Sequence, residues 1–298
     1  MKTCKILGIS LVAFMVLACQ AEPLDEFASN QVKITFRAGF AEQNGTKTML
    51  DEDGTSIWWS PEDSISVFYG TLASAKFTAT NTEPAAFTTF EGTLDVTADS
   101  IEDGSSPDIW AVYPYSPDDA FDGNSVTLSV PPEQLAVAGT FEPGMFPAIS
   151  KANSFDLPFY NVCGGIVFSV VNEEIMFVEL KSNNGEPLAG EVKVAFDADG
   201  YPAVQEVIDG YSTIAVFVNE DEGFIPGEKY FISVLPGTLQ KGLSLVFHKP
   251  FAENTLEKTE SITINRSLFK KALEADQGMA FEDSVAFNSF SRPGSFPI

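Results

Sequence analysis

The sequence predicts an all-β protein of antiparallel β-sandwiches. Short stretches in which apolar and polar residues alternate recur along the chain, and a period of two is typical of a strand with one buried face. Asp-Gly, Asn-Gly and Pro-Gly pairs separate many of these stretches and favour tight reversals. A single short segment has helical spacing. Many short strands with few helices are typical of β-sandwiches.

The first expected strand covers residues 32–40, where Val32, Ile34 and Phe36 begin an apolar face. The polar positions between them carry Lys33 and, further on, Arg37, so we expect the arginine on the outer face. The same alternation predicts seven further strands. They cover residues 64–69, 125–130, 190–196, 212–218, 229–235, 243–247 and 260–264.

One short helix is predicted near the C-terminus, over residues 267–275. Leu268, Phe269, Ala272 and Leu273 have helical spacing there, and Ser267 is a suitable N-cap. The weakly patterned stretch at 145–157 indicates a division of the chain. We therefore expect an N-terminal β-sandwich domain at 31–150 and a C-terminal β-sandwich domain with a tail at 151–298.

Residues 1–18 have the features of a secretory signal peptide: a basic head, an apolar core of about ten residues and a small residue before the cut. This core is too short to span a membrane, which needs about twenty residues. Val16 to Cys19 resembles the lipobox of bacterial lipoproteins. That resemblance implies signal peptidase cleavage between Ala18 and Cys19, acylation of Cys19 and a lipid anchor, followed by a linker at 19–30. The alternative is an ordinary secreted protein in which Cys19 is incidental.

The acidic residues that follow Cys19 resemble the signals that send lipoproteins to the outer face of the outer membrane. The whole chain is also acidic, with a formal net charge of −25. Loss of Lys2 and Lys5 with the signal peptide makes it −27. Such a charge opposes binding to nucleic acid or anionic lipid, so we expect membrane contact through the lipid anchor alone.

Residues suited to catalysis are scarce. Cys163 lies in an apolar context and is expected to be a small buried residue, and the single histidine, His248, to be an edge or turn residue. The segments 51–54 and 197–200 superficially resemble calcium loops but lack the full ligand pattern, so we interpret them as β-turns. We therefore expect no metal, no cofactor and no enzymatic activity.

Several motifs, in order, resemble the fimbrillin-like proteins of the Bacteroidetes. The resemblance spans residues 32–273. It implies two tandem transthyretin-like β-sandwich domains and a role as shaft, tip or anchor subunit of a surface pilus, with other pilus subunits or copies of itself as partners and a possible surface receptor. The motifs are Thr-Lys-Thr at 46–48, Ile-Trp-Trp-Ser-Pro-Glu-Asp at 57–63, Phe-Glu-Gly-Thr-Leu at 90–94, Ala-Val-Tyr-Pro at 111–114, Val-Pro-Pro-Glu-Gln at 130–134, Asp-Ala-Asp-Gly-Tyr-Pro at 197–202 and Pro-Gly-Glu-Lys-Tyr at 226–230.

In shaft subunits of that family an arginine-specific protease removes the first strand, and a strand of the next subunit fills the groove. In this chain the candidate processing site is Arg37, and the candidate displaced strand carries Val32, Ile34 and Phe36. The alternative is an uncut first strand in an anchor or non-polymerising lipoprotein, which we favour because Arg37 lies in mid-strand. The tail after residue 284 is a possible donor strand, although Pro293 and Pro297 make a last strand followed by a loose tail the preferred interpretation.

The alternative function is a surface glycan-binding lipoprotein. Trp58 and Trp59 are the candidates for stacking on sugar rings. Because neighbouring residues in a strand point to opposite faces, we expect one of the two indole rings to be exposed.

Overall fold

The computed structural model describes residues 31–41, 58–70, 73–95, 108–142, 144–172, 175–219, 223–277 and 282–286. Regular structure in these ranges is almost entirely β-strand, which confirms the predicted all-β class. All eight stretches predicted as strands contain one. No helix in the described ranges is long and apolar enough to cross a membrane.

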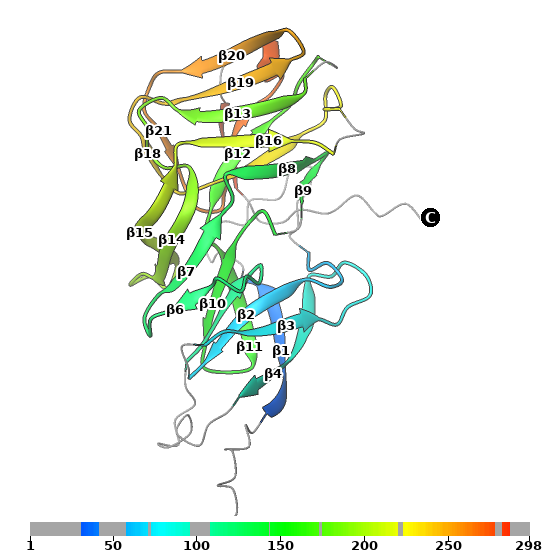
Figure 1. The fold of residues 1–298 in the computed structure, drawn as a ribbon, viewed down its shortest axis with the longest axis vertical. Helices are drawn as coiled ribbons and strands as arrows, with labels where there is room; N and C mark the ends of the chain where they lie inside the picture. The colour runs from blue at the N-terminus through cyan, green and yellow to red at the C-terminus, as the bar shows by residue number, and fades with distance from the viewer. Residues whose placement is uncertain are drawn as a thin grey trace, which may run out of the picture.

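Seven strands form a closed barrel in the lower half of the molecule (Figure 1). Strand β1 closes it, because it pairs antiparallel with β4 on one side and parallel with β11 on the other. In barrel order the strands are β1 (Gln31–Phe40), β11 (Asp156–Asn161), β10 (Ala148–Ala152), β5 (Ile109–Tyr113), β2 (Ser64–Tyr69), β3 (Ala75–Ala79) and β4 (Phe87–Asp95).

Four further sheets make up the rest of the described structure. The largest has six strands, in the order β20 (Ala252–Lys258), β19 (Leu243–Lys249), β13 (Phe177–Ser182), β16 (Thr213–Phe217), β8 (Glu133–Val137) and β9 (Thr140–Phe141). A second contains β17 (Tyr230–Val234), β12 (Gly164–Phe168), β22 (Leu268–Ala272) and β23 (Glu282–Ala286). A third contains β15 (Pro202–Tyr211), β14 (Ala189–Phe196), β7 (Val126–Val130) and β6 (Ala120–Phe121), and the fourth pairs β18 (Gly237–Leu239) with β21 (Ile262–Ile264).

Strand pairing crosses the middle of the chain in both directions. The position between residues 150 and 151, where the sequence suggested a division, lies inside β10. Strands β7 and β8 precede this position, yet they pair with β14 and β16, which follow it. Strand β11 follows it and lies in the barrel. Backbone hydrogen bonding therefore joins the two halves of the sequence.

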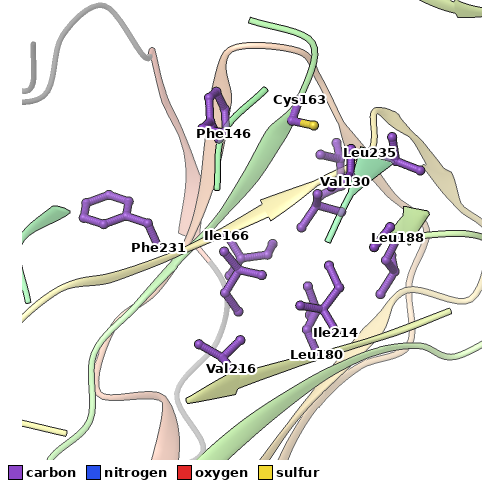
Figure 2. Packing of buried hydrophobic residues seen from close by; sticks show 14 of the residues in the cluster. Val130, Phe146, Cys163, Ile166, Leu180, Leu188, Ile214, Val216, Phe231 and Leu235 are labelled. Carbon is purple, nitrogen blue, oxygen red and sulfur yellow. The ribbon is translucent and has the colours of Figure 1, made fainter. Parts of the chain in front are cut away.

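Two hydrophobic cores correspond to these sheets. One fills the barrel and is rich in phenylalanine. The other lies between the remaining sheets and also takes in Trp110 and Ile149 from barrel strands. Figure 2 shows part of this second core, with Ile166, Leu180 and Cys163 among its members. Cys163 is fully buried, which confirms its predicted role as a small core residue.

The predicted helix over residues 267–275 is wrong. Leu268–Ala272 is strand β22, which pairs parallel with β12 and antiparallel with β23, and a single 3-10 turn follows at Ala275–Gln277. Ser267 is not a helix cap, since its backbone has a positive φ of 59° and its N–H donates to the Cys163 carbonyl. Isolated helices of this length are marginal, so the ladder offered by β12 decides the conformation.

Candidate functional site

Strand β1 has one neighbouring strand over its first part and two over its last part. It pairs with β4 from Gln31, opposite Asp95, to Gly39, opposite Phe87. Its pairing with β11 begins at Arg37 and covers only Arg37–Phe40. Arg37 therefore lies where β1 passes from a single partner to two partners.

The inward face of β1 becomes more buried along the strand. The exposed fraction of Val32 is 44%, Ile34 is half-buried, and Phe36 is fully buried. The Phe36 ring packs against Phe77 at 5.0 Å and Phe155 at 5.6 Å between centroids. Of the three residues in the candidate displaced strand, Phe36 contributes most to the barrel core, because apolar burial scales with the area removed from water.

Arg37 is exposed on the outer face, as the alternation predicted. Its guanidinium lies over the Phe87 ring, 5.6 Å from the centroid, and its backbone N–H donates to the Phe155 carbonyl at 2.8 Å. The Phe87 ring also covers Gly39, where an added Cβ would come within 2.4 Å of two ring carbons. The peptide bond after Arg37 thus lies inside a hydrogen-bonded ladder that an aromatic ring partly covers.

The two neighbouring tryptophans point to opposite sides. Trp59 is buried in the barrel core, where its ring stacks on Phe40 at 4.8 Å and meets Phe90 and Tyr113 at 5.0 and 5.2 Å. The exposed fraction of Trp58 is 42%. The prediction that one ring of the pair is exposed is confirmed. Trp59 has no face open to a sugar ring, so Trp58 alone is available for stacking.

His248 lies near the end of β19, where it pairs with Phe177 of β13 on one side and Glu253 of β20 on the other, so the expectation of an edge or turn residue is wrong. Its Nε2 is 2.7 Å from a carboxylate oxygen of Glu179, and its ring stacks on Phe177 at 4.0 Å. Partial burial opposes ionisation of Glu179, but hydrogen bonds from Lys181 and His248 outweigh it and lower the pKa of this carboxyl. Phe177, Glu179 and Lys181 alternate along β13 and therefore lie on one face of the sheet. The contacts of Phe177 and Glu179 with His248 hold β13 and β19 together.

Cys163 is unsuited to nucleophilic chemistry. Burial raises the pKa of its thiol to about 12. The thiolate is the reactive form of cysteine, and it is strongly disfavoured here. Sequence reasoning anticipated both the burial and its chemical consequence.

The segment at 197–200 forms a turn, as predicted. One carboxylate oxygen of Asp197 accepts the backbone N–H groups of Asp199 and Tyr201, at 3.0 and 2.9 Å, and Gly200 has a positive φ of 81°. Within the described ranges, no group of three or more His, Cys, Asp or Glu side chains is placed to hold a metal ion.

Some predicted sites lie outside the described residues. These are the signal peptide with Ala18 and Cys19, the linker at 19–30, the turn at 51–54 and the tail from residue 287. The strand expected just before that tail is present as β23, where Val285 pairs with Phe269 of β22.

No family model matches the chain, and a search of curated proteins finds no match. The chain is similar to two solved structures, each described as that of a candidate cell adhesion protein. One, from Bacteroides ovatus, has 12% identity and a TM-score of 0.47, with 77% of this chain and 88% of that chain covered. The other, from Bacteroides thetaiotaomicron, has 11% identity and a TM-score of 0.39, with 80% and 92% covered. Likeness at this level does not identify a family.

Proposed function

We propose that this chain is an adhesive or structural lipoprotein of the outer-membrane surface, a fimbrillin-like pilus component. Its expected anchor is the acylated Cys19, and its expected partners are pilus subunits or further copies of itself, joined by β-strand addition. The observation that carries the proposal is the position of β1. This strand closes the barrel, and its one arginine lies where the pairing changes from one neighbour to two.

Cleavage after Arg37 would divide β1 at this change. The piece that leaves, Gln31–Arg37, pairs with β4 along its length and with β11 only at Arg37, whereas Ala38–Phe40 would remain paired with β11 and, up to Gly39, with β4. Departure of Phe36 would open the space beside Phe77 and leave one edge of β4, the edge that faces β1, without a partner over residues 89–95. A strand from another subunit would satisfy those backbone groups and refill the space, which is the physical basis of β-augmentation.

The geometry of Arg37 supports the uncut form as the resting state. Its backbone N–H donates to the Phe155 carbonyl, and the Phe87 ring covers Gly39, two residues further along the strand. A protease acts on such a segment after local opening, and burial of Phe36 makes opening costly. We therefore propose that the protein keeps its lipid anchor and serves as an anchor or as a non-polymerising surface subunit.

Mass spectrometry of the protein isolated from its own cells tests this assignment. An acylated N-terminus at Cys19 is the expected result, and an N-terminus at Ala38 would contradict the anchored form. Immunogold labelling of intact cells provides a separate test of the pilus assignment. Label at the bases of filaments or along them is expected, while label confined to the cell interior would overturn it. A variant without residues 288–298 reports whether the tail acts as a donor, since unchanged assembly would reject that role.

A glycan-binding surface lipoprotein is the second candidate function, and the exposed Trp58 favours it. Binding to a polysaccharide panel that is lost in Trp58→Ala, with the thermal unfolding midpoint unchanged, would support this function. Phe251→Ala is a suitable control, because Phe251 is also an exposed aromatic residue.

We propose that neither function involves catalysis. The fully buried Cys163 thiol, with its raised pKa, supports this view. The net charge of −25 supports the absence of nucleic-acid partners.

A further inference from the structure

Three segments that are distant in sequence bring an arginine and two tyrosines together. Arg266 lies between β21 and β22, Tyr201 lies just before β15, and Tyr160 lies in β11. The Arg266 guanidinium carbon is 4.9 Å from the centroid of the Tyr201 ring. The two tyrosine rings are 5.9 Å apart and inclined at 80°. We call these three residues the Arg266 cluster.

Arg266 is a partly buried cation without a paired carboxylate in the described part of the chain. Its Nη1 donates to the Asn161 carbonyl at 3.1 Å and to Ser267 Oγ at 3.2 Å. The other donors of the guanidinium have no hydrogen-bond partner among the described residues. In contrast, carboxylates of the described residues pair with Lys33, Lys151, Lys181 and Lys193.

This environment disfavours the charge of Arg266. Burial lowers the pKa of the guanidinium, while nearby Tyr201, Asp197 and Tyr160 partly oppose that shift. One carboxylate oxygen of Asp197 accepts two backbone N–H groups of its own turn, and Asp197 forms no ion pair with Arg266. A partly desolvated cation with unused donors is stabilised by an anion that reaches those donors.

The Arg266 cluster is held in place by the surrounding fold. The bond from the Tyr201 N–H to Asp197 fixes the turn that carries Tyr201, and the Tyr160 ring packs against Phe196 at 5.9 Å. Ser267 adopts a positive φ of 59°, an uncommon conformation for a residue other than glycine. Its backbone N–H donates to the Cys163 carbonyl. Strained residues of this kind are concentrated at functional sites.

We propose that the Arg266 cluster binds the carboxylate-bearing ring of an acidic saccharide. The planar guanidinium matches the two oxygens of a carboxylate, and tyrosine offers both a hydroxyl group and an apolar ring for the hydroxyls and C–H groups of a sugar. Neutral saccharides would bring no negative charge to the guanidinium donors that lack a hydrogen-bond partner. The strongly acidic protein repels polyanions as a whole, so the site fits a single acidic ring and not a highly charged polymer. This proposal does not depend on the fate of β1.

Calorimetric titration of the purified protein tests the proposal at low ionic strength. The probes are the methyl glycosides of galacturonate, of glucuronate and of N-acetylneuraminate, each a single acidic ring, and each is compared with its neutral methyl ester. At least one acid should bind, and its ester should bind about tenfold more weakly or worse, because hydrogen bonds to charged groups are the stronger ones. Failure of every acid to bind, or equal binding of acid and ester, would overturn the proposal.

Variants assign the binding to this cluster. Arg266→Gln removes the charge and keeps an amide that can donate, and it should weaken binding by about tenfold or more. Arg37→Gln is the matched control, because Arg37 also lies over an aromatic ring but is exposed, and it should leave binding unchanged. Tyr201→Leu is a second variant in case Arg266→Gln unfolds. Unchanged binding in folded Arg266→Gln or Tyr201→Leu, or equal binding of a short peptide with a free carboxylate, would contradict the assignment.

Discussion

The side-chain amide of Gln134 forms two hydrogen bonds with the backbone of Ser233. Gln134 Nε2 donates to the Ser233 carbonyl, and the Ser233 N–H donates to Gln134 Oε1, both at 2.8 Å. Both residues are buried, with exposed fractions of 2% and 1%. The pair connects β8 of the six-stranded sheet with β17, which lies in the sheet with β12, β22 and β23. The Gln134 side chain therefore forms the two hydrogen bonds with Ser233 that a neighbouring strand would otherwise form.

Replacement of Gln134 by leucine should lower the free energy of unfolding by about 2–4 kcal/mol, because it leaves both buried backbone groups of Ser233 unpaired. Urea titration followed by circular dichroism measures the change. Gln205→Leu is the control, since the exposed Gln205 side chain donates to the nearby Ala203 carbonyl at 3.3 Å and to no other described residue, and it should change stability little. Equal losses in the two variants would show that the paired amide of Gln134 contributes nothing.

Truncation of Phe36 to alanine should destabilise the protein by about 3–5 kcal/mol, the usual cost of removing a buried phenylalanine. It should also speed trypsin cleavage after Arg37, because β1 then opens more often. Val32→Ala is the control, since Val32 is 44% exposed on the same face of the strand. Intact-mass analysis of a digestion time course gives the rate. A cleavage rate equal to that of Val32→Ala would rule out Phe36 as the residue that holds β1 closed.

Gly164 marks a close approach of two backbones. A Cβ at this position would lie 2.0 Å from the Asn265 carbonyl oxygen, which belongs to the turn before Arg266. Gly164→Ala should therefore cost more than about 1 kcal/mol, because overpacking forces the backbone to shift. At Gly237 an added Cβ meets nothing within 4 Å, so Gly237→Ala should be close to neutral. Thermal unfolding distinguishes the two, and similar midpoints would contradict the close approach.

Asp119 should make stability fall as pH rises from about 4 to 6. Burial raises its pKa from 3.8 to about 6, although Ser66 and the Ser116 N–H donate to the carboxylate at 2.6 and 2.9 Å. The folded state therefore holds a proton that the unfolded state releases. Its stabilising contribution is complete below pH 3.8 and is lost through pH 6.

Asp119→Asn removes this titration while preserving a hydrogen-bond acceptor. Relative to the variant, the wild type should lose on the order of 2 kcal/mol between pH 4 and pH 7. The difference between the two urea midpoints at each pH isolates Asp119 from the other carboxyls. A difference that stays constant between pH 4 and pH 7 would disprove the raised pKa.

Much of the local structure follows from sequence patterns. Alternation located β1 and placed Phe36 inward and Arg37 outward, and adjacency in an extended segment predicted opposite orientations for Trp58 and Trp59. The pattern failed at Leu268–Ala272, where a spacing that also suits a helix belongs to a strand. It also offered no signal for the short strands β10 and β12, which are buried on both faces or nearly so and therefore lack alternation.

The sequence by itself determined which residues of a strand face a core, because that choice depends on a period of two within a few residues. The acidity of the chain is likewise fixed by its composition, and the pattern of residues 1–18 predicts a signal for export. Only the tertiary structure decided that β1 closes a barrel against β11, and that Arg266 meets Tyr160 and Tyr201. In each of these contacts the two sides are more than sixty residues apart in the sequence. A pattern within a few residues therefore cannot indicate which strand edge β1 pairs with, or which side chains Arg266 meets. The selection comes from the apolar area that each pairing buries and from the hydrogen bonds that it completes, and both depend on the whole fold.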